Sequence, residues 1–270
     1  MNTSAKHIIA ADIGNSRMKF GRFVLPCDGP KSEALPEPTG VVSLAPDSLR
    51  ELSGWLNEDQ WQDAEFAIGS VQRARTADLI DWLRKHSFAG DIQLLTSDDL
   101  PLEIDVPQPQ RVGMDRLLAA VAANAIRTDD SMAAIVDLGT AITVDVVSSE
   151  GAYQGGAIAP GLAISARALH DATDALPAFD VASLDDAIAP IGRDTVAAMK
   201  SGLFLGAVGA IRELIVRQVG ELSSDTNARY EVYVCGGFAK QVAHLLSANA
   251  IHLPHLILQG IAITVQNAKS

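Results

Sequence analysis

The sequence predicts an α/β protein made of two similar halves. Strand-like apolar runs alternate with helical patterns along the chain. Two segments also share one design: 8–19, I-I-A-A-D-I-G-N-S-R-M-K, and 133–145, A-A-I-V-D-L-G-T-A-I-T-V-D. Each is predicted to be a strand, a turn carrying an aspartate and a glycine, and a returning strand. The equivalent aspartates, Asp12 and Asp137, are 125 residues apart (137 − 12).

At 270 residues the chain is near the upper size for a single core, so two lobes are expected. The turn-rich segment Thr128-Asp129-Asp130-Ser131 marks the best boundary, which gives lobes 1–128 and 129–270. A repeated hairpin in each lobe suggests a duplicated fold with a nucleotide held between the halves.

The first half alternates strands and helices. Strands are expected at 8–12, 18–24, 65–71 and 92–95, and helices at 49–56, 76–86 and 113–127. A loop rich in proline, glycine and charge is expected over 25–38, and three prolines predict irregular structure over 101–110.

The second half opens with the repeated hairpin. Further strands are expected at 153–159 and 230–235, and helices at 160–172, 193–222, 240–247 and after Gly260. Pro160 is expected to begin its helix, because proline suits a first helical position. The long helix carries a stripe of small residues at Gly202, Gly206 and Ala210, which packs on another element of the same subunit or on a partner subunit.

Composition excludes several classes of function. The formal net charge is −12 and the pI is about 4.8, which argues against nucleic-acid binding. The longest candidate for a membrane span, 202–211, is half the length that a bilayer needs, so we expect a cytoplasmic protein without a membrane partner. Cys27 and Cys235 are too few for a disulfide scaffold and are expected to be reduced.

The familiar catalytic motifs are absent from the sequence. It contains no G-x-x-x-x-G-K-[ST], no G-x-G-x-x-G after a strand, no H-E-x-x-H and no G-x-S-x-G. The remaining candidates for functional residues are aspartates and glycines in turns. A glycine turn brings backbone N–H groups close to an anion, and a neighbouring carboxylate or hydroxyl can hold a phosphate or its cation. Either hairpin taken alone is equally consistent with an ordinary tight turn.

A third segment, Gly113-Met114-Asp115-Arg116, stands at a predicted helix start, where the dipole and unpaired N–H groups favour negative charge. A carboxylate that accepts a hydroxyl proton, beside a guanidinium that binds an acid, suits phosphoryl transfer to a small acidic alcohol. Asp115 as a helix cap is the structural alternative. The glycine-rich run 155–161 is explained equally well by close packing or by ligand contact.

In their order along the chain, these motifs resemble those of type III pantothenate kinases. The resemblance rests on 12–19, Gly113-Met-Asp-Arg, 137–145, 155–161 and Gly236-Gly237-Phe238, and it extends to Leu256-Ile-Leu-Gln-Gly260. It implies the duplicated ribonuclease-H-like fold of actin-like ATPases, with ATP in the cleft between two lobes. It also implies ATP-dependent phosphorylation of pantothenate, the first step of coenzyme A biosynthesis, in a homodimer.

The resemblance also implies roles for individual residues. The first turn would bind ATP through Asp12, Ile13, Gly14, Asn15, Ser16, Arg17, Met18 and Lys19. Thr140 would also contact ATP, and Gly236 and Gly237 would lie near the adenosine. Pantothenate would be bound by Gly113, Met114, Asp115 and Arg116, with Asp115 as the catalytic base, and by Thr195 at the dimer interface. Asp137 would bind a monovalent cation, potassium or ammonium, and a divalent cation such as Mg²⁺ would accompany ATP.

Two departures from the family pattern affect the substrate contacts. Ala119 stands where the family often has asparagine, and 101–111 lacks the tyrosine common before the Gly-x-Asp-Arg motif. Two other hypotheses about the function remain: another small-molecule kinase of the superfamily, or a catalytically inactive nucleotide-binding regulator. The joint presence of Lys19, Asp115 and Arg116 speaks against the regulator.

Overall fold

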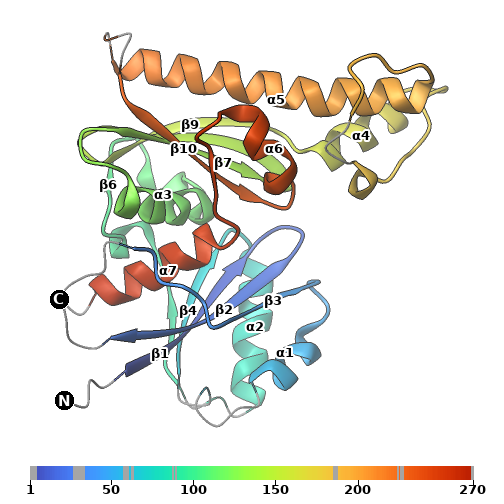
Figure 1. The fold of residues 1–270 in the computed structure, drawn as a ribbon. Helices are drawn as coiled ribbons and strands as arrows, with labels where there is room; N and C mark the ends of the chain where they lie inside the picture. The colour runs from blue at the N-terminus through green and yellow to red at the C-terminus, as the bar shows by residue number, and fades with distance from the viewer. Residues whose placement is uncertain are drawn as a thin grey trace. The chain divides into compact units, whose positions relative to one another are not determined.

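The chain folds into two compact units, as seen in a computed structural model (Figure 1). The structure describes residues 5–26, 34–56, 61, 64–86, 88, 90–184, 188–223, 225 and 228–268. The first unit comprises 1–126 and 255–270, and the second comprises 127–254. The division at 126/127 falls close to the expected boundary, but the last sixteen residues (255–270) belong to the first unit rather than to the lobe 129–270.

The first unit is a five-stranded sheet with helices on both faces. Its strands lie in the order β3 (Gly40–Leu44), β2 (Met18–Pro26), β1 (Ala5–Ile13), β4 (Glu65–Ser70) and β5 (Ile92–Leu94). β1 pairs antiparallel with β2 and parallel with β4. Helices α1 (Leu49–Leu56), α2 (Arg73–Lys85), α3 (Met114–Ile126) and α7 (Leu256–Asn267) complete it, with the short strand β6 (Glu103–Ile104) and 3₁₀ turns at Ser97–Asp99 and Pro109–Arg111.

Successive side chains of a strand point to opposite faces of the sheet, so each face contacts its own pair of helices. Ile9, Ala11 and Ile13 of β1 join a core that includes Leu52 of α1 and Leu79 of α2. The opposite face is covered by α3 and α7, because a Cβ atom added at Gly69 of β4 would meet side chains of both helices. Asp12 lies on that second face, since it alternates with Ile13 and is aligned with Gly69.

The second unit repeats this plan. Five of its strands lie in the order β9 (Ala152–Pro160), β8 (Ala141–Val147), β7 (Met132–Leu138), β10 (Tyr230–Gly236) and β11 (Ile251–His252). β7 pairs antiparallel with β8 and parallel with β10. Helices α5 (Thr195–Leu222) and α6 (Ala239–Leu246) pack on one face, and α4 (Leu162–Asp171) and a 3₁₀ turn at Val181–Ser183 join the N-terminal part of α5.

Five strands have the same arrangement in both sheets, which confirms the predicted duplicated α/β fold. In each, a hairpin and a third antiparallel strand lie on one side, and two parallel strands lie on the other. Asp12 and Asp137 occupy the same position, one residue before the end of the strand that begins each hairpin.

Several element boundaries differ from the sequence prediction. β3 was not expected, and β6 falls within the segment predicted to be irregular. Pro160 ends β9 instead of beginning a helix, a position where its missing N–H is tolerated, and α4 begins at Leu162. Gly260 was expected before the last helix but lies inside α7, where close contact with α3 requires a residue without a side chain.

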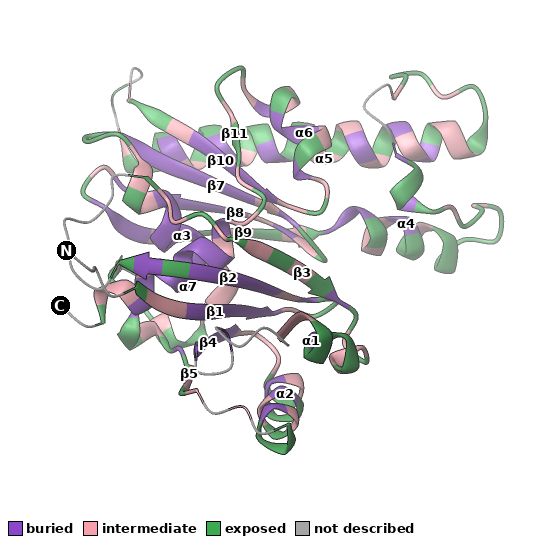
Figure 2. Cartoon of the chain, turned by 60° about the horizontal axis from the view of Figure 1, so that its bottom comes forward, coloured by how far each residue is buried: buried purple, intermediate pink, exposed green. Residues whose placement is uncertain are grey.

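The predicted stripe of small residues on α5 is exposed. Gly202, Gly206 and Ala210 are all exposed, and Cβ atoms added at the two glycines would meet nothing within 4 Å. Figure 2 shows buried and exposed residues alternating along this helix. The alternative in which the stripe packs inside one subunit is therefore wrong for the residues that the structure describes.

Candidate functional site

The first hairpin places a carboxylate opposite an ammonium group at the end of a buried strand. Asp12 is 9% exposed, and its cross-strand neighbour is Lys19 on β2. Directly opposite residues in an antiparallel pair project from the same face of the sheet. The two charges therefore lie on one face, next to the turn formed by residues 14–17.

The side chains of this turn have different surroundings. Ile13 and Met18 are buried in the core, so they can meet a ligand only through their backbone. Asn15 and Ser16 are exposed at the tip. Arg17 turns toward β3, where its Nε donates to the Ser43 hydroxyl at 2.7 Å and its Nη2 donates to the Ser43 carbonyl at 3.0 Å.

The Gly-x-Asp-Arg segment forms the start of α3, as the sequence predicts. The backbone N–H of Arg116 donates to Oδ1 of Asp115 at 2.8 Å, so the carboxylate folds back over the helix terminus. A Cβ atom at position 113 would lie 2.5 Å from that oxygen, which explains why glycine precedes Asp115 by two residues. Asp115 and Arg116 are both partly exposed.

Packing within the first unit brings the two motifs to the same end of its sheet. A Cβ atom at Gly113 would lie 3.7 Å from Val71, which directly follows β4, and the Val71 N–H donates to the Ile13 carbonyl. The start of α3 therefore lies beside the carboxyl ends of the parallel strands β1 and β4. Ligands of open α/β sheets bind at this edge.

The second hairpin holds Asp137 in a niche bounded by glycines. A Cβ atom at Gly236 would lie 2.4 Å from Oδ1 of Asp137, and one at Gly139 would lie 3.5 Å from it. Gly236 has φ +97°, a left-handed conformation that favours glycine. Thr143 is the cross-strand neighbour of Asp137. Carboxylate and hydroxyl oxygens are the ligands that hard cations prefer.

The turn between β7 and β8 is tied to the start of α4. Thr140 is exposed, and its carbonyl accepts a hydrogen bond of 3.2 Å from the Gly161 N–H. A Cβ atom at Gly161 would lie 2.4 Å from that carbonyl oxygen. One end of the glycine-rich run 155–161 is thus explained by close packing.

Close packing also explains Gly156, where a Cβ atom would lie 2.5 Å from Oδ1 of the buried Asp145. That oxygen accepts a 2.8 Å hydrogen bond from the Tyr153 hydroxyl. Asp145 is therefore held inside the sheet.

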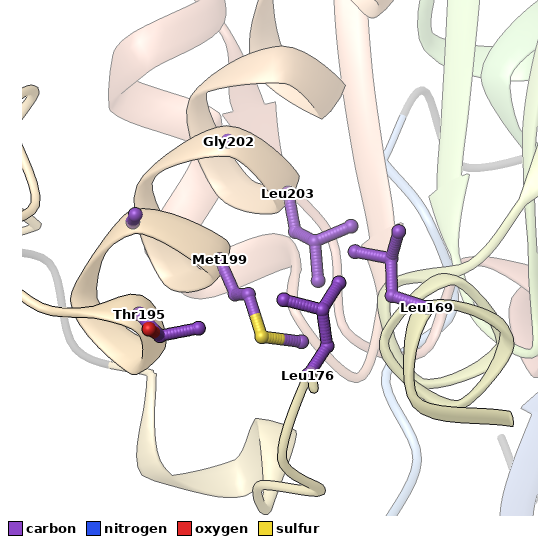
Figure 3. Close-up of a pocket in the computed structure, with 7 residues that line it drawn as sticks. Leu169, Leu176, Thr195, Met199, Gly202 and Leu203 are labelled. Carbon is purple, nitrogen blue, oxygen red and sulfur yellow. The ribbon is translucent and has the colours of Figure 1, made fainter. Parts of the chain in front are cut away.

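Thr195 lines an apolar pocket of about 430 Å³ between α4 and the start of α5 (Figure 3). Figure 3 shows Met199, Leu203, Leu176 and Leu169 directed toward one another beside it. The threonine is exposed on the first turn of α5. Asp194 caps the helix by accepting from the Ala197 N–H at 2.8 Å.

A second pocket, of about 600 Å³, lies between α4 and the Gly236-Gly237-Phe238 turn. Phe179 and Phe238 offer aromatic surfaces there, and Arg167, His170 and Asp180 offer polar groups. The pocket is therefore next to the segment that the resemblance associates with adenosine.

The sequence does not predict a group of hydrogen bonds that holds the Glu231 side chain, here called the Glu231 clamp. This carboxylate accepts hydrogen bonds from the Thr128 N–H and hydroxyl at 3.0 and 2.6 Å, and from the Tyr233 hydroxyl at 2.7 Å. Burial alone would raise the pKa of Glu231, but these bonds together with one from Ser131 outweigh it and lower the pKa. Burial and the contact with Glu231 raise the pKa of Tyr233. The clamp fixes the chain where it enters the second unit.

Within the described part of the chain, no group of three or more histidine, cysteine, aspartate or glutamate side chains is arranged to hold a metal ion. No described helix is long and apolar enough to span a bilayer. Cys235 is buried in β10, whereas Cys27 lies outside the described residues.

Comparison with known proteins decides the family. The profile of a family described as type III pantothenate kinase matches residues 8–217. The chain belongs to the type III pantothenate kinase family. A type III pantothenate kinase from Dehalococcoides mccartyi (strain ATCC BAA-2266 / KCTC 15142 / 195) is 39% identical over 269 residues, covering 97% of this chain and 98% of that protein.

Another relative matches over a similar share of the chain. The type III pantothenate kinase of Desulfosudis oleivorans is 35% identical over 270 residues, covering 97% of this chain and all of the relative. A solved structure from Listeria monocytogenes, described as a candidate N-acetylmannosamine kinase, is 14% identical, with a TM-score of 0.53 over 98% of this chain and all of that one. This likeness concerns the fold alone.

Proposed function

We propose that the protein transfers the γ-phosphoryl group of ATP to the hydroxyl group of pantothenate, as the first step of coenzyme A biosynthesis. Membership of the type III pantothenate kinase family supports this function. The observation that carries it is the position of Asp115, whose carboxylate is fixed at the start of α3 beside the ends of β1 and β4.

Asp115 is the proposed catalytic base. Its carboxylate would accept the proton of the pantothenate hydroxyl as that oxygen attacks the γ-phosphorus in line with the departing ADP. The hydrogen bond from the Arg116 N–H holds one carboxylate oxygen in place. Arg116 would bind the pantothenate carboxylate, and Gly113 and Met114 would line the same site.

The first hairpin would bind the phosphates of ATP. ATP carries about four negative charges, so on a chain of net charge −12 local groups must provide the attraction. Lys19 and the backbone of the 14–17 turn would provide it. A divalent cation such as Mg²⁺ supplies further neutralisation of the phosphate charge when bound.

Asp137 would bind a monovalent cation, potassium or ammonium. Its niche fits such an ion because the Asp137 carboxylate and the hydroxyl of its cross-strand neighbour Thr143 offer oxygen atoms, and because Gly139 and Gly236 place no side chain beside that carboxylate. Thr140, on the adjoining turn, would contact ATP. The pocket beside Gly236, Gly237 and Phe238 would receive the adenosine.

The working unit is proposed to be a homodimer. The exposed stripe at Gly202, Gly206 and Ala210 allows another helix backbone to approach α5 closely. Thr195 lies on the same helix, so a partner seated there would border its pocket and complete the pantothenate site. A Gly206→Leu variant should shift toward monomer in sedimentation and lose pantothenate turnover in parallel. A wild-type protein that sediments as an active monomer would contradict the dimer.

Phosphate transfer to pantothenate, measured with ATP, magnesium and potassium, tests the function. Asp115→Asn should keep ATP binding but lower turnover by about two to four orders of magnitude, the range of a general base. Sodium-only buffer should nearly abolish activity. Transfer to a sugar or another acid instead would assign a different kinase, and nucleotide binding without any transfer would assign a regulator. We place the reaction in the cytoplasm, without nucleic acid or membrane.

A further inference from the structure

The tip of the first hairpin is held by two side chains from the start of α2. Nη1 of Arg75 donates to the Gly14 carbonyl at 3.0 Å and also to the Asn15 carbonyl. The Gln72 side-chain amide donates to Oδ1 of Asn15 at 2.6 Å. These bonds connect residues about sixty positions apart in the sequence.

The start of α2 is itself fixed to the sheet. The Ser70 hydroxyl, at the end of β4, accepts from the Gln72 N–H at 2.9 Å and from the Thr76 hydroxyl at 2.6 Å. Thr76 is buried, and its hydroxyl oxygen also lies 2.9 Å from the Gln72 carbonyl oxygen. Arg75 therefore projects from a rigid helix start, which is what a positioning group needs.

We infer that Arg75, assisted by Gln72, is a positioning residue for ATP, acting through the Gly14–Asn15 turn that it holds. This inference rests on the proposed role of that turn in phosphate binding. Arg17 anchors the other side of the turn to Ser43, so the tip is fixed from both α2 and β3.

Two physical effects follow from the Arg75 contacts. Carbonyl oxygens carry partial negative charge, which repels phosphate, and a guanidinium bound to both oxygens offsets that charge. The same bonds fix the turn before ATP arrives, so less conformational freedom is lost on binding. Both effects act on nucleotide affinity rather than on the proton transfer assigned to Asp115.

Kinetics of Arg75→Ala test the inference. We expect the KM for ATP to rise about tenfold, which corresponds to about 1.4 kcal/mol, while kcat and the KM for pantothenate stay within about threefold. Arg75→Lys should recover part of the affinity, because an ammonium can still reach a carbonyl. Arg73→Ala is the matched control, since Arg73 is exposed on the same helical turn, and it should leave every constant unchanged.

Calorimetric titration of each variant with Mg-ATP, in the absence of pantothenate, separates this inference from the proposed function. If the wild type binds ATP but does not phosphorylate pantothenate, the weaker binding of Arg75→Ala still supports the inference. Equal ATP affinity in wild type and Arg75→Ala overturns it, even if the kinase activity is established. Should Arg75→Ala fail to fold, Gln72→Ala replaces it, and unchanged ATP affinity there and in Arg75→Lys overturns the inference as well.

Discussion

Replacing Gly113 by alanine should disable the proposed base while leaving the fold intact. The new Cβ atom would lie 2.5 Å from Oδ1 of Asp115, and its next neighbours would be 3.7 Å away. An ordinary contact begins at 3.4 Å, so the carboxylate must retreat by about 0.9 Å. Gly113 does not have a positive φ, so the backbone itself accepts alanine.

The magnitude follows from these distances. A reacting group misplaced by about 1 Å costs on the order of 100-fold in rate, so kcat should fall about 100-fold. Stability should change by less than about 1 kcal/mol, because only the end of one side chain moves and alanine restricts the unfolded chain.

The assay combines steady-state kinetics with thermal unfolding. Gly54→Ala on α1 is the control, since its Cβ would meet nothing within 4 Å, and it should leave kcat unchanged. A Gly113→Ala protein that folds normally and keeps kcat within about threefold of wild type would refute the role given to the Asp115 carboxylate.

Two further substitutions test the packing that supports the site. Gly260→Ala would place a Cβ atom 2.0 Å from the Leu118 carbonyl oxygen, so α3 and α7 must separate. We expect the free energy of unfolding, measured in urea, to fall by about 1–3 kcal/mol. An unchanged free energy of unfolding would contradict the close packing of the two helices at this position. For Glu231 the folded-state pKa is lowered, so its contribution to stability is present above the ordinary value of 4.5 and is lost as the pH falls through the lower folded-state pKa. Glu231→Gln should therefore reduce the unfolding free energy at neutral pH and weaken its fall in acid, and an unchanged pH profile would contradict the clamp.

The sequence predicts those parts of the fold that depend on local patterns. Both hairpins were found because apolar runs lead into turn residues, and α3 and α5 were found from their helical periodicity. β3 was missed because it is a short edge strand in which partly buried and exposed residues alternate, and only its last residue, Leu44, is buried. Glycine at 260 suggested a helix boundary, but its place inside α7 is decided by α3, which lies far away in the sequence.

The residues of the candidate site are also only partly predictable from the sequence. Asp12, Asp115 and Asp137 stand in recognisable motifs, so their positions were predicted. Arg75 and Gln72 carry no such signal, because a polar side chain at the start of a helix normally indicates a solvated face. Their role depends on contacts with the turn at 14–15, which only the folded first unit creates. Residues that hold a site in place are therefore harder to predict than residues that form it.

The two equivalent hairpins differ in the residue that faces the aspartate across the strands. Asp12 and Asp137 occupy the same strand position, but the cross-strand neighbour is Lys19 in the first unit and Thr143 in the second. In the proposed function, the first pair combines a carboxylate with an ammonium that would face phosphate, whereas the second combines a carboxylate with a hydroxyl oxygen, a pair that would suit a cation. Because the backbone plan is shared, we propose that this difference in the facing strand separates a hairpin that binds phosphate from one that binds a cation.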